Sequence, residues 1–142
     1  MGQKVNPHGM RVGVIKDWDS RWFTSKQEFG DTLVEDHKIR KTLKKQLYAA
    51  GVPKIEIERT VDSQTGTPRV QVNVFCAKPG IVIGKGGAES AKIEKQLAKL
   101  TGKNVNLNIV EVKGTTTNAQ LVAEDVACLL YTSDAADDRI SV

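Results

Sequence analysis

The chain has little cysteine, and its two thiols are far apart in the sequence. Cys76 and Cys128 are the only cysteines among 142 residues, and they lack the CxxC spacing of zinc and redox sites. His8 and His37 do not join them in any metal-ligand pattern, so the sequence predicts no metal site and no cofactor. This cysteine usage is typical of a cytosolic protein with reduced thiols.

Long hydrophobic runs and catalytic constellations are also missing. No apolar segment is long enough to span a bilayer and no secretory signal is present, so we expect no membrane partner. No nucleophile–base pairing or carboxylate pair stands out, which predicts a protein that is not an enzyme. Apolar residues make up 39% of the chain, which excludes general disorder. The formal net charge of +4 favours polyanionic partners, although many unrelated proteins are as basic.

Hydrophobic periodicity predicts an α/β domain after an irregular N-terminal arm. Residues 1–25 show little periodicity, and their aromatic residues either lie on a partner or cover the domain's own core. Ser25 and Glu28 match a capping box for a lead-in helix, which Gly30 interrupts or weakens. The remaining predicted elements are a helix from about Asp36 to Gly51, strands at 55–58 and 70–76, a short helix at 79–83, a helix from Ala88 to Gly102, a strand at 105–109 and a last helix from Ala119.

The second strand of this series decides the place of Cys76. The residues Val70, Val72, Val74 and Cys76 alternate with polar neighbours, so all four point to one face. We therefore expect Cys76 to be a buried core residue.

The predicted helix from Asp36 carries a run of bases on its polar side. Five of eight consecutive residues are basic with no acid among them, namely Lys38, Arg40, Lys41, Lys44 and Lys45. A run of this kind is usually a solvated face. The rival interpretation is a face that contacts phosphates.

A glycine-rich segment at 80–87 is compatible with three phosphate-binding motifs, and spacing separates them. A Walker A loop would need one more residue before Lys85 and a hydroxyl where Gly86 stands. A dinucleotide fingerprint would need a third glycine where Glu89 stands. These failures argue against a nucleotide-using enzyme.

The third motif is the GXXG loop of KH domains, which clamps about four unpaired nucleotides. Here a short apolar helix leads to Gly84, Lys85, Gly86 and Gly87, and a second helix begins at once. The glycines let the backbone approach a sugar-phosphate, the helix N-terminus favours phosphate and Lys85 adds a cation. The element order, helix–strand–strand–helix–helix–strand, predicts a type II KH domain with its helices on one face of a three-stranded sheet.

Several segments resemble the small-subunit ribosomal protein three family of bacteria. The similarity covers residues 1 to about 127, and its most specific part is the N-terminal run Gly2–Pro7 with Arg11–Gly13. The segments 55–59 and 78–84 are similar to the family's KH domain, and 108–112 and 121–124 resemble the join to its second domain. The family's members continue into a basic stretch and that second domain.

The resemblance implies a structural constituent of the small ribosomal subunit, located on cytoplasmic ribosomes. Its partners would be ribosomal RNA of the subunit head, neighbouring small-subunit ribosomal proteins and, nearby, the mRNA. Lys4 and Arg11 match the family's basic arm, and only the loop residues have a motif-level role in RNA contact. A non-ribosomal KH module that regulates or assembles RNA is the alternative.

These observations predict four segments, and the last is expected to be foreign to the family. They are an arm with a lead-in helix at 1–37, the KH domain at 38–113, the start of a truncated second domain at 114–127 and a tail at 128–142. The tail is acidic, and its residues 128–137 resemble one reading frame of a common sequencing-library adapter. We expect the residues after about Tyr131 to be disordered, because they lack a core partner.

Overall fold

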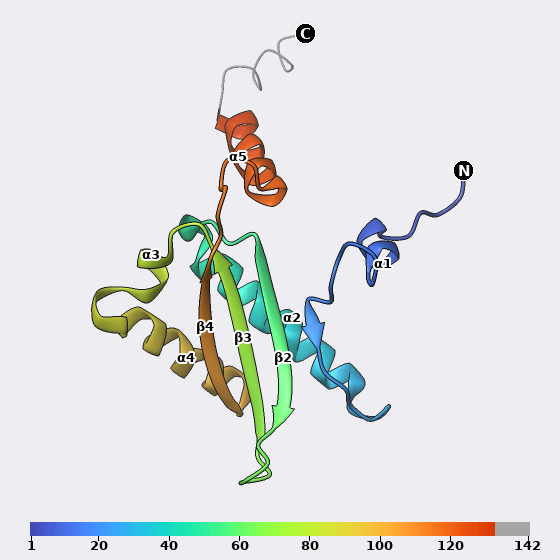
Figure 1. Ribbon diagram of the computed structural model, residues 1–142, viewed down its shortest axis with the longest axis vertical. Helices are drawn as coiled ribbons and strands as arrows, with labels where there is room; N and C mark the ends of the chain where they lie inside the picture. The colour runs from blue at the N-terminus through green and yellow to red at the C-terminus, as the bar shows by residue number, and fades with distance from the viewer. Residues whose placement is uncertain (133–142) are drawn as a thin grey trace.

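The computed structural model describes residues 1–132 (Figure 1). The predicted disorder of the tail concerns residues after about Tyr131, and all of these except Thr132 lie outside the described residues. Thr132 is the last residue of the last helix. The elements in chain order are α1 (Pro7–Arg11), β1 (Ser20–Arg21), α2 (Phe29–Gln46), β2 (Lys54–Val61), β3 (Pro68–Cys76), α3 (Pro79–Ile83), α4 (Ala88–Thr101), β4 (Asn104–Glu111) and α5 (Ala119–Thr132). Single 3-10 turns occupy Tyr48–Ala50 and Lys85–Gly87. Among the described residues, no helix is long and apolar enough to cross a membrane.

The strands form one mixed sheet in the order β1-β2-β3-β4. β2 and β3 are antiparallel, whereas β1 runs parallel to β2 and β4 runs parallel to β3. Helices α2 and α4 cover one face of this sheet (Figure 1). The predicted type II KH order and α/β class are confirmed, and β1 adds a short fourth strand to the three that were predicted.

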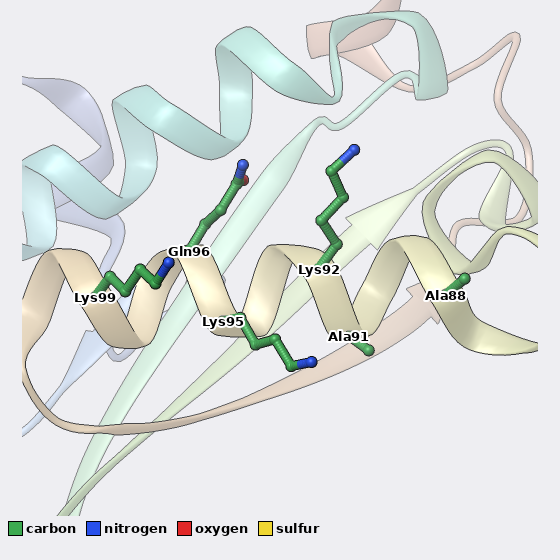
Figure 2. A pocket seen from close by; sticks show the side chains of 6 residues that line it. All are labelled: Ala88, Ala91, Lys92, Lys95, Gln96 and Lys99. Atoms are coloured by element: carbon green, nitrogen blue, oxygen red, sulfur yellow. The ribbon is translucent and has the colours of Figure 1, made fainter.

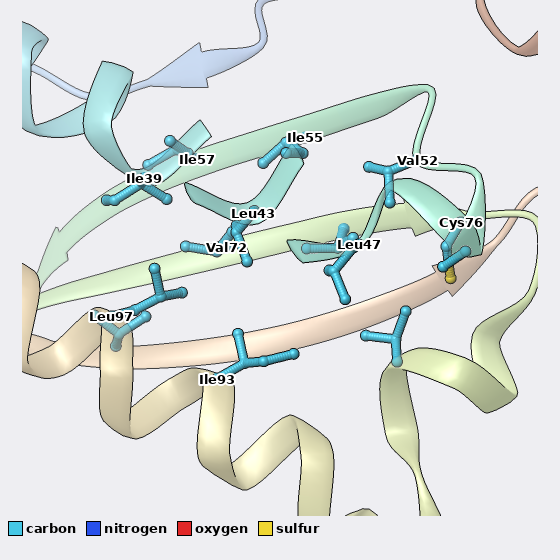
Figure 3. Close-up of a cluster of buried hydrophobic side chains, with 14 of the residues drawn as sticks. Ile39, Leu43, Leu47, Val52, Ile55, Ile57, Val72, Cys76, Ile93 and Leu97 are labelled. Carbon is cyan, nitrogen blue, oxygen red and sulfur yellow. The ribbon is translucent and has the colours of Figure 1, made fainter. Parts of the chain in front are cut away.

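The core lies between this helix layer and the sheet (Figure 3). Ile39 and Leu43 of α2 and Leu97 of α4 are almost fully buried. They pack with the alternating residues of the strands, of which Ile57 and Val72 are fully buried. Complete burial of one such side chain contributes about 1.5–3 kcal/mol, so this layer contact dominates the stability of the fold.

The start of α2 differs from the prediction. The helix begins at Phe29, and the residue before it, Glu28, forms no side-chain cap hydrogen bond. Gly30 lies inside the first turn, so it neither interrupts the helix nor separates a lead-in helix from the rest. The α-helix ends at Gln46, and Gly51, with a φ of 68°, ends the 3-10 turn that follows. Contacts with the sheet thus extend α2 beyond what its local sequence suggests.

A buried carboxylate ties the N-terminal arm to α2 and the sheet. Asp36 is 3% exposed and accepts hydrogen bonds from Trp22 Nε1 at 2.6 Å and from Ser20 Oγ at 3.2 Å. Arg59 of β2 donates to Asp36 through Nε at 3.0 Å and pairs with Glu35 at 2.7 Å. The stretch around Ser20 and Trp22 therefore lies on the domain itself, close to one of the two interpretations, whereas the neighbouring Phe23 is exposed.

The first part of the arm, in contrast, does not pack on the domain. Val5, Met10 and Trp18 are exposed, and α1 lies apart from the sheet in Figure 1. This segment covers no core, which leaves it available to lie on a partner. Contact of this first stretch with a partner stays a prediction.

Glu35 gives the fold a dependence on pH. Burial alone raises the pKa of Glu35, but the hydrogen bond from Lys103 at 2.9 Å and the charge of Arg59 outweigh it and lower this pKa. A carboxylate with a lowered pKa stabilises the fold at neutral pH, and this contribution is lost as the pH falls through its folded-state pKa. We expect Glu35→Gln to lower the free energy of unfolding at neutral pH and to have little effect in acid. Urea unfolding of both proteins over a pH series measures this, and a difference that does not change with pH would contradict it.

Cys76 lies in the core, as predicted. It is fully buried at the end of β3, and burial raises the pKa of its thiol. We expect a thiol reagent to label native Cys128→Ser protein very slowly and unfolded protein fast, because the thiolate is the reactive form. Mass spectrometry over time reads this out, and Cys76→Ser, which keeps the exposed Cys128, is the control that labels quickly. Rapid labelling of native Cys128→Ser protein would show that Cys76 is not in the core.

Candidate nucleic-acid interface

At its first position, the glycine loop adopts a backbone conformation that only glycine fits. Gly84 follows α3 with a φ of 69° and a ψ of −171°, a conformation essentially restricted to glycine. A Cβ built there would lie 2.7 Å from Cγ of Glu89 and 3.2 Å from its backbone nitrogen. α3 is anchored by fully buried Val82, so the loop starts from a fixed point.

The tip of the loop is open. Gly86 and Gly87 have φ values of 62° and 79°, and a Cβ on Gly86 would meet nothing within 4 Å. Lys85 is exposed beside them. The amide of Ala88 donates to the carbonyl of Lys85, but Gly87 caps α4 without a side-chain hydrogen bond, so the next amides of α4 remain available to an anion. The four predicted loop residues therefore lie together and offer backbone amides and one cation to a phosphate.

Apolar side chains border this loop. Ile81 and Ile83 of α3 are 49% and 41% exposed, while Val82 between them is buried. This exposed apolar surface lies directly beside the glycine loop. Their alternation with Val82 was the sequence signal for this surface.

The basic run on α2 divides into two groups. Arg40 donates to the carbonyl of Asp19 at 2.9 Å, to Ser20 Oγ at 2.7 Å and to the carbonyl of Ile55. Lys44 donates to the carbonyl of Val52 and pairs with Glu124 of α5. These two side chains hold parts of the fold together. Both also line one hollow of the surface with Lys41 and Lys45, so phosphate contact by the run stays a prediction.

The other three bases of the run, Lys38, Lys41 and Lys45, are exposed. They lie on the side of α2 away from the core residues Ile39 and Leu43. No ion pair joins them to any residue between 1 and 132.

The arm residues are not part of the loop site. Lys4 and Arg11 are exposed. In Figure 1 the arm lies beyond the β2 edge of the sheet, whereas α3 lies beyond the opposite edge, next to β4. The carbonyl of Arg11 accepts from the amides of Val14, Ile15 and Lys16, all at 3.1 Å, which closes a compact turn. An RNA contact at Lys4 or Arg11 would therefore be separate from the loop.

The sequence interpretation missed a second group of bases. Figure 2 shows Lys92, Lys95 and Lys99 on the exposed side of α4, with Ala88, Ala91 and Gln96 between them. Glu94 lies between these lysines in the sequence and Glu89 lies just before them, which hides the pattern. The spacing of three and four residues was the signal that could have found them.

Comparison with known proteins identifies the fold family. The KH domain family matches residues 38–116, from the middle of α2 to beyond β4. The chain belongs to the KH domain family. The matched range contains the loop Gly84–Gly87 and both groups of helix lysines.

The predicted resemblance to the ribosomal family is also confirmed. The chain is 59% identical over 128 residues to small ribosomal subunit protein uS3 of Clostridioides difficile, covering 89% of this chain and 45% of that protein. It is 59% identical over 130 residues to uS3 of Agathobacter rectalis and 52% identical over 130 residues to uS3 of Acetivibrio thermocellus. Both of these matches cover 92% of this chain, and they cover 56% and 55% of the relatives, respectively. The chain thus spans about half the length of the curated relatives it matches.

Proposed function

We propose that this KH protein is a structural, non-catalytic constituent of the small ribosomal subunit in the cytoplasm. The observation that carries the proposal is an open GXXG loop inside a chain that is 52–59% identical to uS3 proteins over about nine-tenths of its length. The backbone amides and Lys85 would hold the phosphates of unpaired ribosomal RNA in the subunit head. The exposed arm with Lys4 and Arg11 would lie on RNA or on neighbouring ribosomal proteins, close to the mRNA.

Within described residues 1–132, no group of three or more His, Cys, Asp or Glu side chains could hold a metal ion. The proposal needs no metal, since positioning of RNA requires contacts to phosphates and bases rather than a reaction. Domain limits near 38 and 113 belong to the same proposal.

Sedimentation tests the proposal directly. The tagged chain is expressed in a bacterium, and the extract is separated on a sucrose gradient under conditions that dissociate the ribosomal subunits. We expect the chain to sediment with the small subunit and to leave it after ribonuclease treatment. If the chain stays at the top of the gradient bound to other RNAs, the alternative of a regulatory KH module is correct.

The exposed lysines of α2 should add to RNA affinity by neutralising phosphates. Replacing Lys38, Lys41 and Lys45 with glutamine should lower the slope of log affinity against log salt by about one unit for each phosphate that is no longer neutralised. The measurement is binding to small-subunit ribosomal RNA at several salt concentrations. Arg40 and Lys44 are left unchanged because their replacement would disturb the fold.

A variant with the same change in net charge is the control for this test. Lys26, Arg69 and Lys113 are exposed and lie outside α2, α4 and the stretch around Lys4 and Arg11, so their replacement by glutamine should change the slope much less. An unchanged slope in the α2 variant would show that these lysines form a solvated face.

A further inference from the structure

Helices α2 and α4 lie side by side and run in opposite directions. Gln46 near the end of α2 donates to Gln96 in the middle of α4 at 2.9 Å. Lys103, just after α4, pairs with Glu35 in the first half of α2 at 2.9 Å. The two contacts fix the antiparallel direction and make one surface from the outer sides of both helices.

This surface carries six exposed lysines, three from each helix. We name it the two-helix basic face, and its members are Lys38, Lys41, Lys45, Lys92, Lys95 and Lys99. In the described part of the chain none of the six forms an ion pair. In Figure 2, Lys92 and Gln96 point toward α2 and Lys95 points away from it, and Lys95 lines the same hollow as Lys92 and Lys99.

The acids of the two helices do not neutralise this face. Glu35 is engaged by Arg59 and Lys103, Asp36 is buried, and Glu94 accepts from the amide of Leu107 on β4. Asp31 and Glu89 lie in the first turns, at the helix ends. The positive charge therefore stays concentrated over the middle of both helices.

We propose that the two-helix basic face binds the phosphate backbone of double-stranded RNA, as a second RNA site beside the glycine loop. The proposal rests on the proposed RNA-binding function and specifies what this face recognises. Lysines seven residues apart along each helix span about 10 Å, and packed helices are about 8–10 Å apart, so the charges form a broad array. Duplex RNA is recognised mostly through such shape and phosphate contacts.

The chemistry of the face favours a duplex over a single strand. Sequence-tolerant binding of single strands uses aromatic side chains on which bases stack. On α4 the residues around the lysines are Ala88, Ala91 and Gln96, none of them aromatic. On α2, exposed Tyr48 and His37 line a hollow together with Lys41 and Lys45, so the α2 half does contain aromatic side chains. The α4 half has cations but no stacking platform, and it fits a ligand whose bases are turned inward.

The same chemistry argues against a protein partner. Protein interfaces are depleted in lysine and have an apolar centre. Lys92 and Lys99 lie about one helical turn to either side of Gln96, which accepts the hydrogen bond from Gln46 of α2. The charge of the two-helix basic face therefore complements a polyanion.

Binding of two RNA probes to matched variants tests the inference. The α4 variant K92Q/K95Q/K99Q and the control K26Q/R69Q/K113Q change the net charge equally, and K85D/G86D alters the loop alone. Each protein is titrated with a 20-base-pair RNA duplex and with a short unpaired RNA at several salt concentrations. We expect the α4 variant to lower the duplex salt slope by about two to three units. The unpaired RNA should bind it as it binds the unmodified chain. K85D/G86D should show the reverse pattern.

Each outcome decides between the two proposals. The inference is wrong if the unmodified chain binds unpaired RNA but not the duplex. It is also wrong if the α4 variant and the control bind the duplex alike. In both cases the proposed function stands. Binding of an acidic polypeptide in preference to the duplex would also overturn the inference. If the chain binds neither RNA, the proposed function itself fails.

Discussion

Replacement of Asp36 by alanine should lower the free energy of unfolding by about 3–5 kcal/mol, the usual cost of breaking a buried ion pair from one side. The change leaves the Arg59 guanidinium, which is largely buried, without one of its two acids. It also removes the acceptor of Trp22 Nε1 and of Ser20 Oγ. The arm should therefore detach from α2, and protease should cut it between residues 18 and 28 much faster.

Asp17→Ala is the matched control for this prediction. Asp17 pairs with Arg21 at 2.6 Å, but both side chains are about half exposed, so its replacement should cost less than about 1 kcal/mol. Urea unfolding followed by circular dichroism compares the two variants. A similar small decrease in stability in both would show that Asp36 does not anchor the arm.

The double substitution K85D/G86D should weaken binding to unpaired RNA by about tenfold to a hundredfold, which corresponds to removing charge-assisted hydrogen bonds of about 1.5–3 kcal/mol. The new carboxylates would stand where phosphate is expected to bind. The fold should survive, because Gly86 has open space around it and aspartate tolerates a left-handed backbone better than most residues.

The variant K85Q/G86N separates charge from backbone effects. Asparagine tolerates the same conformation at position 86, and glutamine removes the cation without adding a carboxylate. We expect this variant to bind more weakly than the unmodified chain and more tightly than K85D/G86D. Titrations of fluorescent RNA measure all three, with circular dichroism as the check on folding. Equal affinity of all three proteins would exclude the loop from the RNA site.

Local patterns in the sequence were sufficient for most of the fold and for the loop. Val70, Val72 and Val74 alternate with polar residues, and this period of two identifies a strand and its buried face without any knowledge of neighbours. The glycines at 84, 86 and 87 were equally informative, because all three adopt positive φ values that other residues avoid. Asn118 caps the last helix, since its Oδ1 accepts from the amide of Gln120 at 3.1 Å.

The roles of the basic residues were decided only by the tertiary structure. Arg40 and Lys41 are neighbours of the same charge, yet Arg40 binds backbone carbonyls of the arm and of β2 while Lys41 is exposed. The difference depends on which partner lies within reach, and those partners are 15 and 21 residues away in the sequence. Likewise, β1 exists because the arm meets the edge of β2, and the lysines of α4 join those of α2 because the sheet places the helices side by side. Periodicity reports which side of an element is buried, whereas long-range contacts determine what each exposed charge meets.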